Sequence, residues 1–296
     1  MHETTPHCFA NHMGLYLCQP AWLMQAVALV RAGAYPLIDA RPPTPRERLY
    51  HVGTDGVAVI PMSGPLFKGG SKFSSASTVD TRRAVRQARD DPDVRGILLH
   101  IDSPGGHVAG IQELADEVKA TDKVKPIHAH LDDLGASAAY WVASQARHVT
   151  ANATAQVGSI GVIAIVEDTS GAAELAGVKV HVMATGERKG DFAPGIPVTD
   201  DALDALREEI ADTHEHFLAA VSRGRGMRGK RLDAVADGRT WIAAKAQGLG
   251  LIDAVASEDD AFGGIVRAAK SNRPGRRQRA EVAIRLADLR GRDSHM

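Results

Sequence analysis

The feature that most constrains the fold of this chain is an alternation of short apolar runs with segments of helical periodicity. Residues 57–62 and 96–101 are almost continuously apolar over the length of a strand, and residues 78–90 between them carry sparse apolar positions at helical spacing. In a third segment, residues 111–118, the apolar side chains again fall on one helical face. Buried strands separated by helices are typical of largely parallel sheets. The sequence therefore predicts an α/β fold.

The same alternation continues toward the C-terminus. We expect further strands at residues 126–131, 148–151, 159–166 and 178–183, and a helix of small residues that opens within residues 135–141. A glycine- and proline-rich loop is expected at residues 184–198. A long helix then begins near Asp200, because apolar residues recur on one face of it. These residues are Leu203, Leu206, Ile210, Phe217 and Val221.

The composition excludes several classes of protein. Lys and Arg total 35 and Asp and Glu total 36, so the net charge of -1 gives no support for a basic nucleic-acid binder. No run of 18 apolar residues occurs, so no membrane span is predicted. The first residues lack the pattern of a signal peptide, and two cysteines, Cys8 and Cys18, do not suggest a disulfide scaffold. We expect a cytoplasmic protein.

Three regions are expected along the chain. Residues 1–50 form an N-terminal appendage that ends in a proline-rich linker at 41–45, and residues 51–262 form the main domain. Residues 263–296 form a basic, partly disordered tail, because its arginines outnumber its acidic residues. This tail is a candidate contact for another protein or a segment removed by cleavage.

Two patterns that suggest ligand sites have simpler explanations. The sequence GRGMRGK at residues 224–230 matches part of a phosphate-binding loop, but it follows a helix, and Arg231 stands where such a loop needs Ser or Thr. We interpret it as a glycine-rich helix end. The loose group of His7, Cys8, His12 and Cys18 lacks the spacing of a zinc finger. We therefore expect no nucleotide, no metal and no cofactor.

Ser137 is set in a more informative pattern. Small residues flank it on both sides, and it lies between an expected strand and an expected helix, as in a nucleophile turn that lets a substrate approach closely. The helix N-terminus would favour negative charge that develops there. Taken alone, the pattern is better explained by an ordinary helix N-cap. The rest of the chain decides between these two interpretations.

Six further sequences occur in order along the chain. They are DSPGG at 102–106, ASAAYW at 136–141, GSIGV at 158–162, GERKGDFAP at 186–194, VSRGRGM at 221–227 and GRTWIAAKAQGLGLID at 238–253. In this order they resemble the signal peptide peptidase A and phage protein C family of serine peptidases, within the ClpP and crotonase superfamily. The resemblance covers residues 55–256. It departs from the family at residues 138 and 139, which are alanines where the family often has glycines.

This resemblance implies a ClpP/crotonase-like spiral of ββα units and a Ser-Lys dyad, with Ser137 as the nucleophile and Lys189 as the general base. A serine hydroxyl needs a base to take its proton. No histidine lies between His148 and His181, so a Ser-His-Asp triad of the ClpP kind is not expected. A lysine acts as a base only where its surroundings lower its pKa from about 10.4 toward roughly 7 to 8.

The resemblance also nominates the groups around the dyad. An oxyanion needs preorganised N–H donors, which the family match places at Gly105, Gly106 and Ala138. Glycine suits this position because it lets the backbone approach the scissile carbonyl. Ser159 is a candidate helper that would hydrogen-bond the lysine.

The activity implied is a serine endopeptidase that acts on protein or peptide substrates. Members of the family form rings, so we expect a homo-oligomer whose isolated monomer is inactive. The favoured setting is phage capsid maturation, with cleavage of scaffold, portal or capsid proteins in the host cytoplasm or inside proheads, because the sequence QPAWLM at 19–24 resembles the start of such proteases. The alternatives are a cellular protease acting on membrane or signal peptides, a catalytically silent head component, and an acyl-CoA enzyme, which CoA binding would reveal.

Overall fold

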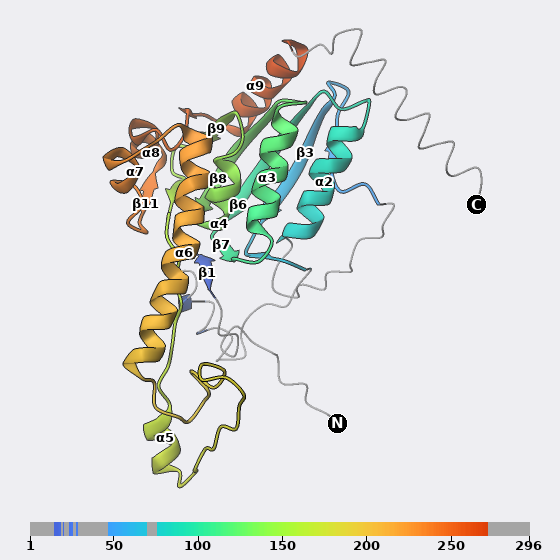
Figure 1. Ribbon diagram of the computed structural model, residues 1–296. Helices are drawn as coiled ribbons and strands as arrows, with labels where there is room; N and C mark the ends of the chain where they lie inside the picture. The colour runs from blue at the N-terminus through green and yellow to red at the C-terminus, as the bar shows by residue number, and fades with distance from the viewer. Residues whose placement is uncertain are drawn as a thin grey trace, which may run out of the picture.

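The computed structural model describes residues 15–18, 20, 24, 25, 28, 47–69 and 76–271 of the chain. This part contains a large sheet of eight strands, a small sheet of four strands, and helices on both faces of the large sheet (Figure 1). The expected proline-rich linker at 41–45 and the arginine-rich part of the tail lie outside the described residues.

The large sheet has a parallel centre. Strand β3 (Val57–Ser63) pairs in parallel with β6 (Gly96–Ser103), and β6 pairs in parallel with β8 (Ile127–Ala136). Strand β8 then pairs with β9 (His148–Ala151) and, at its C-terminal end, with β10 (Gln156–Gly158). The outer strands are β2 (His51–Val52) beside β3, β11 (Thr240–Ile242) beside β10, and β12 (Ala254–Val255) beside β9. The predicted α/β fold is confirmed.

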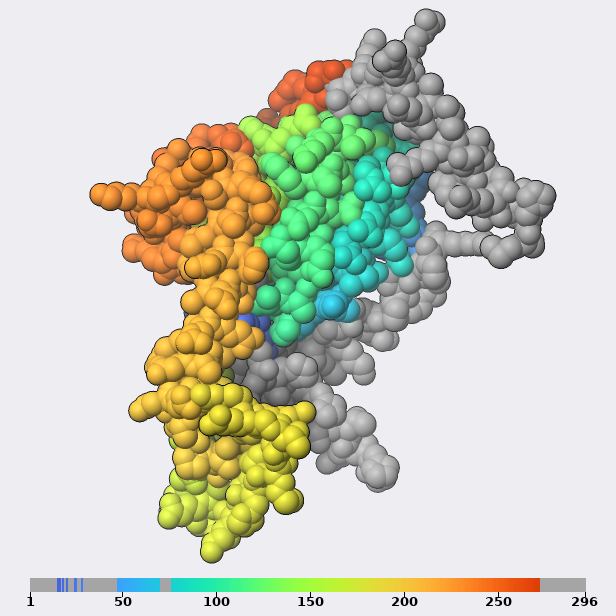
Figure 2. Space-filling view, in the orientation of Figure 1, coloured from blue at the N-terminus to red at the C-terminus, as the bar shows by residue number. Residues whose placement is uncertain are grey.

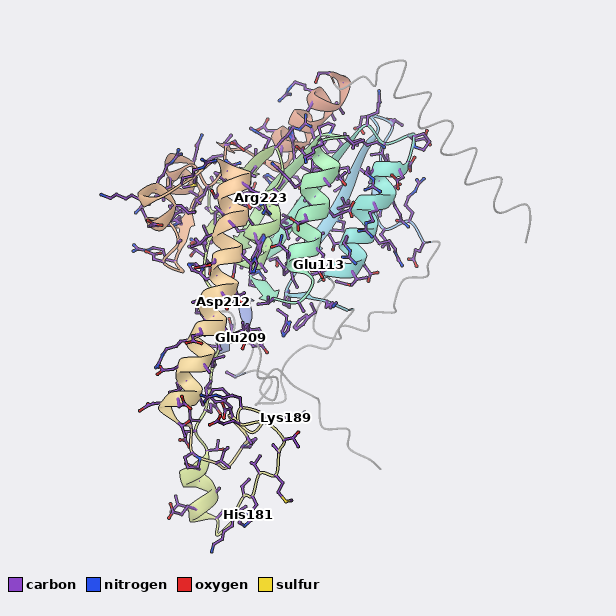
Figure 3. All side chains as sticks on the ribbon, viewed as in Figure 1. Glu113, His181, Lys189, Glu209, Asp212 and Arg223 are labelled. Carbon is purple, nitrogen blue, oxygen red and sulfur yellow. The ribbon has the colours of Figure 1, made fainter. Side chains whose placement is uncertain are left out.

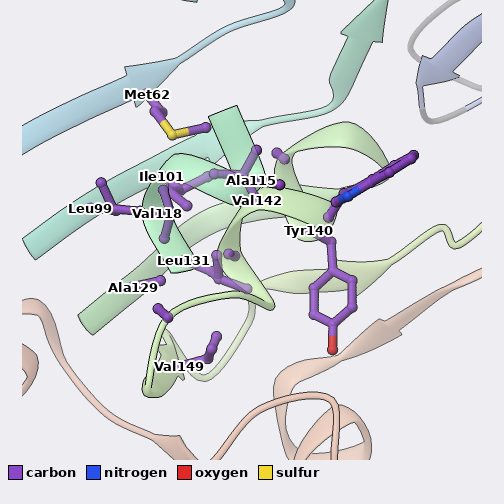
Figure 4. Close-up of a cluster of buried hydrophobic side chains, with 14 of the residues drawn as sticks. Met62, Leu99, Ile101, Ala115, Val118, Ala129, Leu131, Tyr140, Val142 and Val149 are labelled. Carbon is purple, nitrogen blue, oxygen red and sulfur yellow. The ribbon is translucent and has the colours of Figure 1, made fainter. Parts of the chain in front are cut away.

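Helices α2 (Thr78–Asp90), α3 (Ile111–Asp122) and α4 (Ala138–Ala143) cover one face of this sheet. The larger apolar core lies beneath them, where Leu99 and Ile101 of β6 meet Val118 of α3 (Figure 4). Helix α2 has the predicted bounds, and its start is fixed by the Ser77 hydroxyl, which accepts a hydrogen bond of 3.2 Å from the Asp80 N–H. The parallel strands are buried on both faces, as their sequences predict.

Helix α9 (Glu258–Ser271) covers the opposite face of the sheet. Its buried residues Ile265 and Ala269 pack against Val57 and Leu98. The helix therefore crosses the expected boundary between the main domain, which ends at residue 262, and the tail, which starts at residue 263. The packed domain extends at least to Ser271, because the apolar stripe of this helix completes a core that the strands alone leave open.

The small sheet begins where β6 ends. Its strand order is β1 (Tyr16–Cys18), β7 (Gly105–His107), β4 (Leu66–Phe67) and β5 (Ala76–Ser77). Strand β1 comes from the N-terminal region, which we expected to be an appendage, and it pairs antiparallel with β7. A part of that region is thus built into the main body.

An arm projects from this body (Figures 1 and 2). It comprises residues 164–199 and contains the short helix α5 (Ser170–Leu175), and none of its residues is buried. The chain returns to the body through the long helix α6 (Asp200–Arg225), whose start is capped by the Thr199 hydroxyl. Helices α7 (Lys230–Asp233) and α8 (Ala243–Leu249) follow in the body.

Two predicted strands are wrong. Residues 159–166 do not continue β10, because Ser159 has a positive φ of 51° that turns the chain away, and only Ile163 forms a bridge, with Tyr16. Residues 178–183 form no strand in the described structure; they lie in the arm with their side chains exposed. Their alternating valines have the pattern of a strand but no sheet to join within the described chain.

The glycine-rich sequence at 224–230 is a helix end, as predicted. Helix α6 stops at Arg225, and Gly226 adopts the left-handed conformation that commonly ends helices. Gly224 has a packing role, since a Cβ there would lie 2.0 Å from the Ser144 carbonyl oxygen. This close contact lets α6 approach the end of α4.

Candidate active site

Ser137 lies at the turn between β8 and α4. Its backbone has φ 54° and ψ -120°, a combination that non-glycine residues rarely adopt. The turn is held in place by a hydrogen bond of 2.7 Å from the Ser137 N–H to the Gly158 carbonyl. The sequence predicted a nucleophile turn here, and the local backbone has the sharp strand-to-helix bend that such a turn requires.

The hydroxyl of Ser137 is buried, and its Oγ has no hydrogen-bond partner among the described residues. The residue occupies the N-cap position of α4 but makes no capping hydrogen bond to that helix. The N-cap interpretation is therefore wrong. A buried hydroxyl without a partner costs about 1–3 kcal/mol, so its position calls for a functional explanation.

Dense packing fixes the turn and the short helix that follows it. A Cβ on Gly135 would lie 2.6 Å from Cδ1 of Leu131 in the same strand, so a larger residue would displace the Leu131 side chain. The Tyr140 hydroxyl donates a hydrogen bond of 2.8 Å to the Leu251 carbonyl, and the Trp141 ring stacks on Phe217 of α6 at 4.7 Å. The Ser137 backbone is thus supported from several elements at once.

The glycine turn after β6 lies beside this helix. Ser103 is in register with Gly135, and β7, which contains Gly105 and Gly106, contacts α4. Gly105 has a φ of 95°, and its N–H donates to the Ser103 hydroxyl at 3.2 Å. A Cβ on Gly106 would lie 2.0 Å from the Leu66 carbonyl oxygen, so β7 approaches β4 closely only because this residue is glycine. The predicted oxyanion donors thus lie on two elements, β7 and α4, that contact each other.

Asp102 precedes this turn and is partly buried. Burial, followed by the nearby carboxylates of Asp132 and Asp133, raises the pKa of Asp102 above its usual value. Its backbone carbonyl accepts a hydrogen bond of 2.8 Å from the Gly64 N–H. This bond ties the turn to the end of β3 and supports the interpretation that Asp102 shapes the turn.

Ser159 also lies close to the Ser137 turn. It follows Gly158, whose carbonyl holds the Ser137 N–H, and its own N–H donates to the Arg239 carbonyl at 2.8 Å. The residue is buried and has an unusual positive φ. The structure therefore places this candidate helper next to the nucleophile turn.

Lys189 is not brought together with Ser137 in the single chain. It lies in the arm, is exposed, and lines a surface hollow with residues 182–185 (Figure 3). Its neighbour Arg188 forms ion pairs with Asp201 at 2.6 Å and with Asp191 at 3.6 Å. Because the Ser137 hydroxyl has no described hydrogen-bond partner, the expected dyad is not assembled within the single chain.

Sequence reasoning did not predict the strand β1 in this region. Its residues Tyr16 and Cys18 are buried, and the strand pairs with the glycine-containing β7. Three residues are too few to show a periodicity, so no signal in the sequence could have placed this strand here.

The described residues contain no group of three or more His, Cys, Asp or Glu side chains that could hold a metal ion. Of the four residues weighed as zinc ligands, Cys18 is buried in β1, and the other three lie outside the described residues. No helix in the described ranges combines the length and apolar character needed to cross a membrane.

Comparison with known proteins identifies several relatives. The profile of peptidase family S49 matches residues 119–271, just over half of the chain. "Protease 4" of Haemophilus influenzae is 28% identical over 73% of this chain and 35% of its own length. "Capsid assembly protease C" of Escherichia phage lambda is 32% identical over 62% of this chain and 43% of its own length. The match thus spans less than half the length of each of these two relatives.

A solved structure is similar at a lower level. An enoyl-CoA hydratase/isomerase family member matches with a TM-score of 0.46 and 17% sequence identity, over 85% of each chain. The family resemblance that the sequence motifs predict is confirmed by the S49 match and by the named proteases.

Proposed function

Since this chain belongs to peptidase family S49, we propose that it is a serine endopeptidase with Ser137 as its nucleophile and Lys189 as its general base. The observation that carries this proposal is the Ser137 hydroxyl, which is buried, unpartnered among the described residues and held on a strained turn. Backbone strain and an unsatisfied buried hydroxyl at the same residue are typical of a hydroxyl that takes part in a reaction.

The chemistry follows from these roles. The Ser137 Oγ attacks the scissile carbonyl carbon while the neutral lysine Nζ takes the hydroxyl proton. As the C–N bond breaks, the same proton passes to the leaving amine, and an acyl ester on Ser137 remains. Water then attacks this ester with the lysine again acting as base, which releases the acid product and restores the serine.

We place the oxyanion of the tetrahedral intermediate against the amides of the Gly105–Gly106 turn and of Ala138. Ala138 opens α4, and the first amides of a helix have no partner within the helix. The Gly105 N–H donates to the Ser103 hydroxyl, a single weak acceptor that an oxyanion would displace. This arrangement supplies N–H donors on two sides of the reacting carbonyl.

We further propose that Lys189 completes the site of a neighbouring protomer in a homo-oligomer. The arm that carries it has no buried residue, and its apolar side chains include Leu175 and Met183, which are 93% and 94% exposed. Apolar side chains gathered on a projecting segment favour contact with another protein surface. Contact with a second copy would also remove Lys189 from water, which a lysine base requires.

Mixing two inactive variants tests this arrangement directly. Ser137→Ala and Lys189→Ala each abolish cleavage when assayed alone. If the lysine acts on a neighbour, an equal mixture of the two variants regains about a quarter of wild-type activity, since a random site pairs an intact serine with an intact lysine in that fraction. A mixture that stays inactive, although native mass spectrometry shows mixed oligomers, would assign the lysine to its own chain.

For the biological setting, we propose processing of phage scaffold, portal or capsid proteins in the host cytoplasm or within proheads. The relative named "Capsid assembly protease C" supports this setting, whereas the relative named "Protease 4" leaves a cellular role as the second candidate. Co-expression with the neighbouring head genes, followed by intact mass of their products, separates the two. Processing that is lost in Ser137→Ala supports the head protease, and processing that persists in this variant assigns the cleavage to another enzyme.

A further inference from the structure

Strand β1 is held by hydrogen bonds along both of its edges. On one edge its three residues are in antiparallel register with β7, with Tyr16 opposite His107, Leu17 opposite Gly106 and Cys18 opposite Gly105. On the other edge the Tyr16 N–H donates to the Ile163 carbonyl and the Ile163 N–H donates to the Tyr16 carbonyl, both at 2.9 Å. We call the space between β7 and Ile163 the β1 slot.

The two chain segments that border the β1 slot both begin near the nucleophile turn at Ser137. Strand β7 starts just after Ser103, which is in register with Gly135. The other wall starts at Gly158, which is in register with Ala136 and accepts the hydrogen bond from the Ser137 N–H. Both walls of the β1 slot therefore begin beside the two residues that precede Ser137.

The direction of β1 brings it toward the proposed oxyanion donors. Tyr16 lies at the outer end of the slot, between His107 and Ile163, and Cys18 lies at the inner end, opposite Gly105. The contact is close, since Tyr16 and Cys18 are buried and the Tyr16 ring meets the His107 ring edge-on at 5.7 Å. The Leu15 carbonyl adds a hydrogen bond of 3.4 Å from the Val108 N–H.

A slot of this kind recognises any extended peptide. Without β1, strand β7 would be an edge of its sheet, and edge strands with unpaired N–H and C=O groups are sites where an added strand binds through its backbone. The glycines in β7 present no side chain that would select against particular residues of the added strand.

We propose that residues 15–18 occupy the peptide-binding site of their own chain and compete with substrate for it. This inference rests on the proposed function, because that function identifies the reacting site. Whether β1 occupies the slot can still be measured by peptide binding alone, without any cleavage. A tethered occupant reduces the fraction of molecules that can bind a free peptide, and the apparent affinity for that peptide falls by the same factor. Release of β1 is then a required step before any substrate is cleaved.

The test uses full-length Ser137→Ala protein and a fluorescent peptide with the sequence of residues 13–20. Tyr16→Pro removes the N–H that bonds Ile163, while Tyr16→Phe keeps every backbone bond of β1 and serves as the matched control. Fluorescence anisotropy should show that Tyr16→Pro binds the peptide at least about tenfold more tightly than Tyr16→Phe. Hydrogen exchange at the Ile163 amide should accelerate in Tyr16→Pro alone.

Equal peptide affinity in the two variants, despite faster exchange at Ile163, would overturn the proposal. A second variant covers the case in which Tyr16→Pro does not fold. A site for a sequence-specific protease is placed within residues 41–45, the folded protein is cut there, and the N-terminal fragment is allowed to dissociate on dilution. Peptide binding that strengthens after the fragment leaves supports the proposal, and unchanged binding contradicts it.

The proposed function can fail separately. If Tyr16→Pro gains peptide affinity but no variant with an intact Ser137 cleaves any peptide, the slot is a peptide site and the assignment of the nucleophile is wrong. If cleavage occurs and depends on Ser137, while Tyr16→Pro changes neither affinity nor rate, the peptidase assignment stands and β1 is a permanent strand of the sheet.

Discussion

Ser137 combines two features that destabilise a folded chain. Its positive φ costs about 1–3 kcal/mol for a non-glycine residue, and its buried, unpartnered hydroxyl adds a cost of similar size. Neither is needed to build the strand or the helix on its two sides. The contacts of Tyr140 and Trp141 hold the turn in spite of these costs.

Removal of this hydroxyl should therefore stabilise the protein while it abolishes activity. We expect Ser137→Ala to raise the free energy of unfolding by up to about 1 kcal/mol in urea denaturation, because an unsatisfied buried group is lost. The matched control is Ser144→Ala, at the other end of α4. The Ser144 hydroxyl donates to the Trp141 carbonyl at 2.7 Å, so its loss should destabilise by about 1 kcal/mol. A similar loss of unfolding free energy in both variants would mean that the Ser137 hydroxyl has a hydrogen-bond partner in solution.

His128 in β8 gives the stability a defined dependence on pH. Burial, then the nearby His148 and Arg147, lowers the pKa of His128 to about 4. In the unfolded chain an ordinary histidine titrates near 6.5, so between about pH 6.5 and 4 the unfolded state binds a proton that the folded state does not. The contribution of neutral His128 to stability is thus complete above about pH 6.5 and is lost as the pH falls toward 4.

Urea midpoints measured from pH 7 to pH 4 should accordingly fall, and they should fall less steeply in His128→Gln. The control is His181→Gln, in the exposed arm (Figure 3), which should leave the acid slope unchanged. An unaltered slope in His128→Gln would show that other groups cause the loss of stability in acid.

At the scale of elements, α9 shows how the sheet obtains its second covering layer. Gly96 makes the contact close, since a Cβ there would lie 3.1 Å from the Ala269 Cβ and 3.2 Å from the Ile265 side chain. The helix thereby seals β3 and β6 on the face opposite α2 and α3. A chain cut at residue 262 would lose most of this layer.

Ile265→Ala should lower the free energy of unfolding by about 2–4 kcal/mol, because it leaves a cavity against Val57 and Leu98. Lys270→Ala, at an exposed position of the same helix, should change it by less than about 0.5 kcal/mol. Urea unfolding of the two variants tests whether α9 belongs to the core. Equal unfolding free energies would show that the helix is only loosely attached.

The elements that the sequence predicted best are those with long periodic patterns. Helix α2 has the predicted bounds, and α6 begins at the predicted Asp200. The strand predicted at 178–183 failed for a physical reason: alternating valines indicate that one face is covered, but not that the covering surface belongs to the same chain. At the site, small residues and ordered motifs made Ser137 and the glycine turn candidates, whereas the unpartnered hydroxyl and the separation of Lys189 from it depend on tertiary packing.

At the scale of the whole molecule, the arm differs from the rest of the described chain. It has no buried residue, it presents large apolar side chains, and it carries the proposed base away from the body that holds the nucleophile (Figure 3). The stability of the body does not depend on these exposed apolar side chains. Assembly and folding should therefore respond to different substitutions.

The double variant Leu175→Asp with Met183→Asp should dissociate the proposed oligomer and reduce cleavage at least about tenfold, since charges in an apolar contact are strongly unfavourable. At a protein concentration at which both proteins are monomeric, its urea midpoint should equal that of the wild type, because both side chains are exposed in the monomer. Val124→Asp places a charge at an exposed apolar position of the body and should leave assembly intact. Sedimentation velocity checks all three proteins, and an intact double-variant oligomer would contradict the role of the arm.

The length of α6 has a consequence for when such an enzyme works. Its 26 residues extend about 39 Å, so the arm reaches well beyond the body that anchors it. If the nucleophile of one chain meets the base of another only through this arm, two chains must associate before cleavage. The rate of cleavage then rises more steeply than linearly with the enzyme concentration. Scattered copies would be harmless to the proteins around them, and crowding into a confined space would itself be the signal that starts digestion.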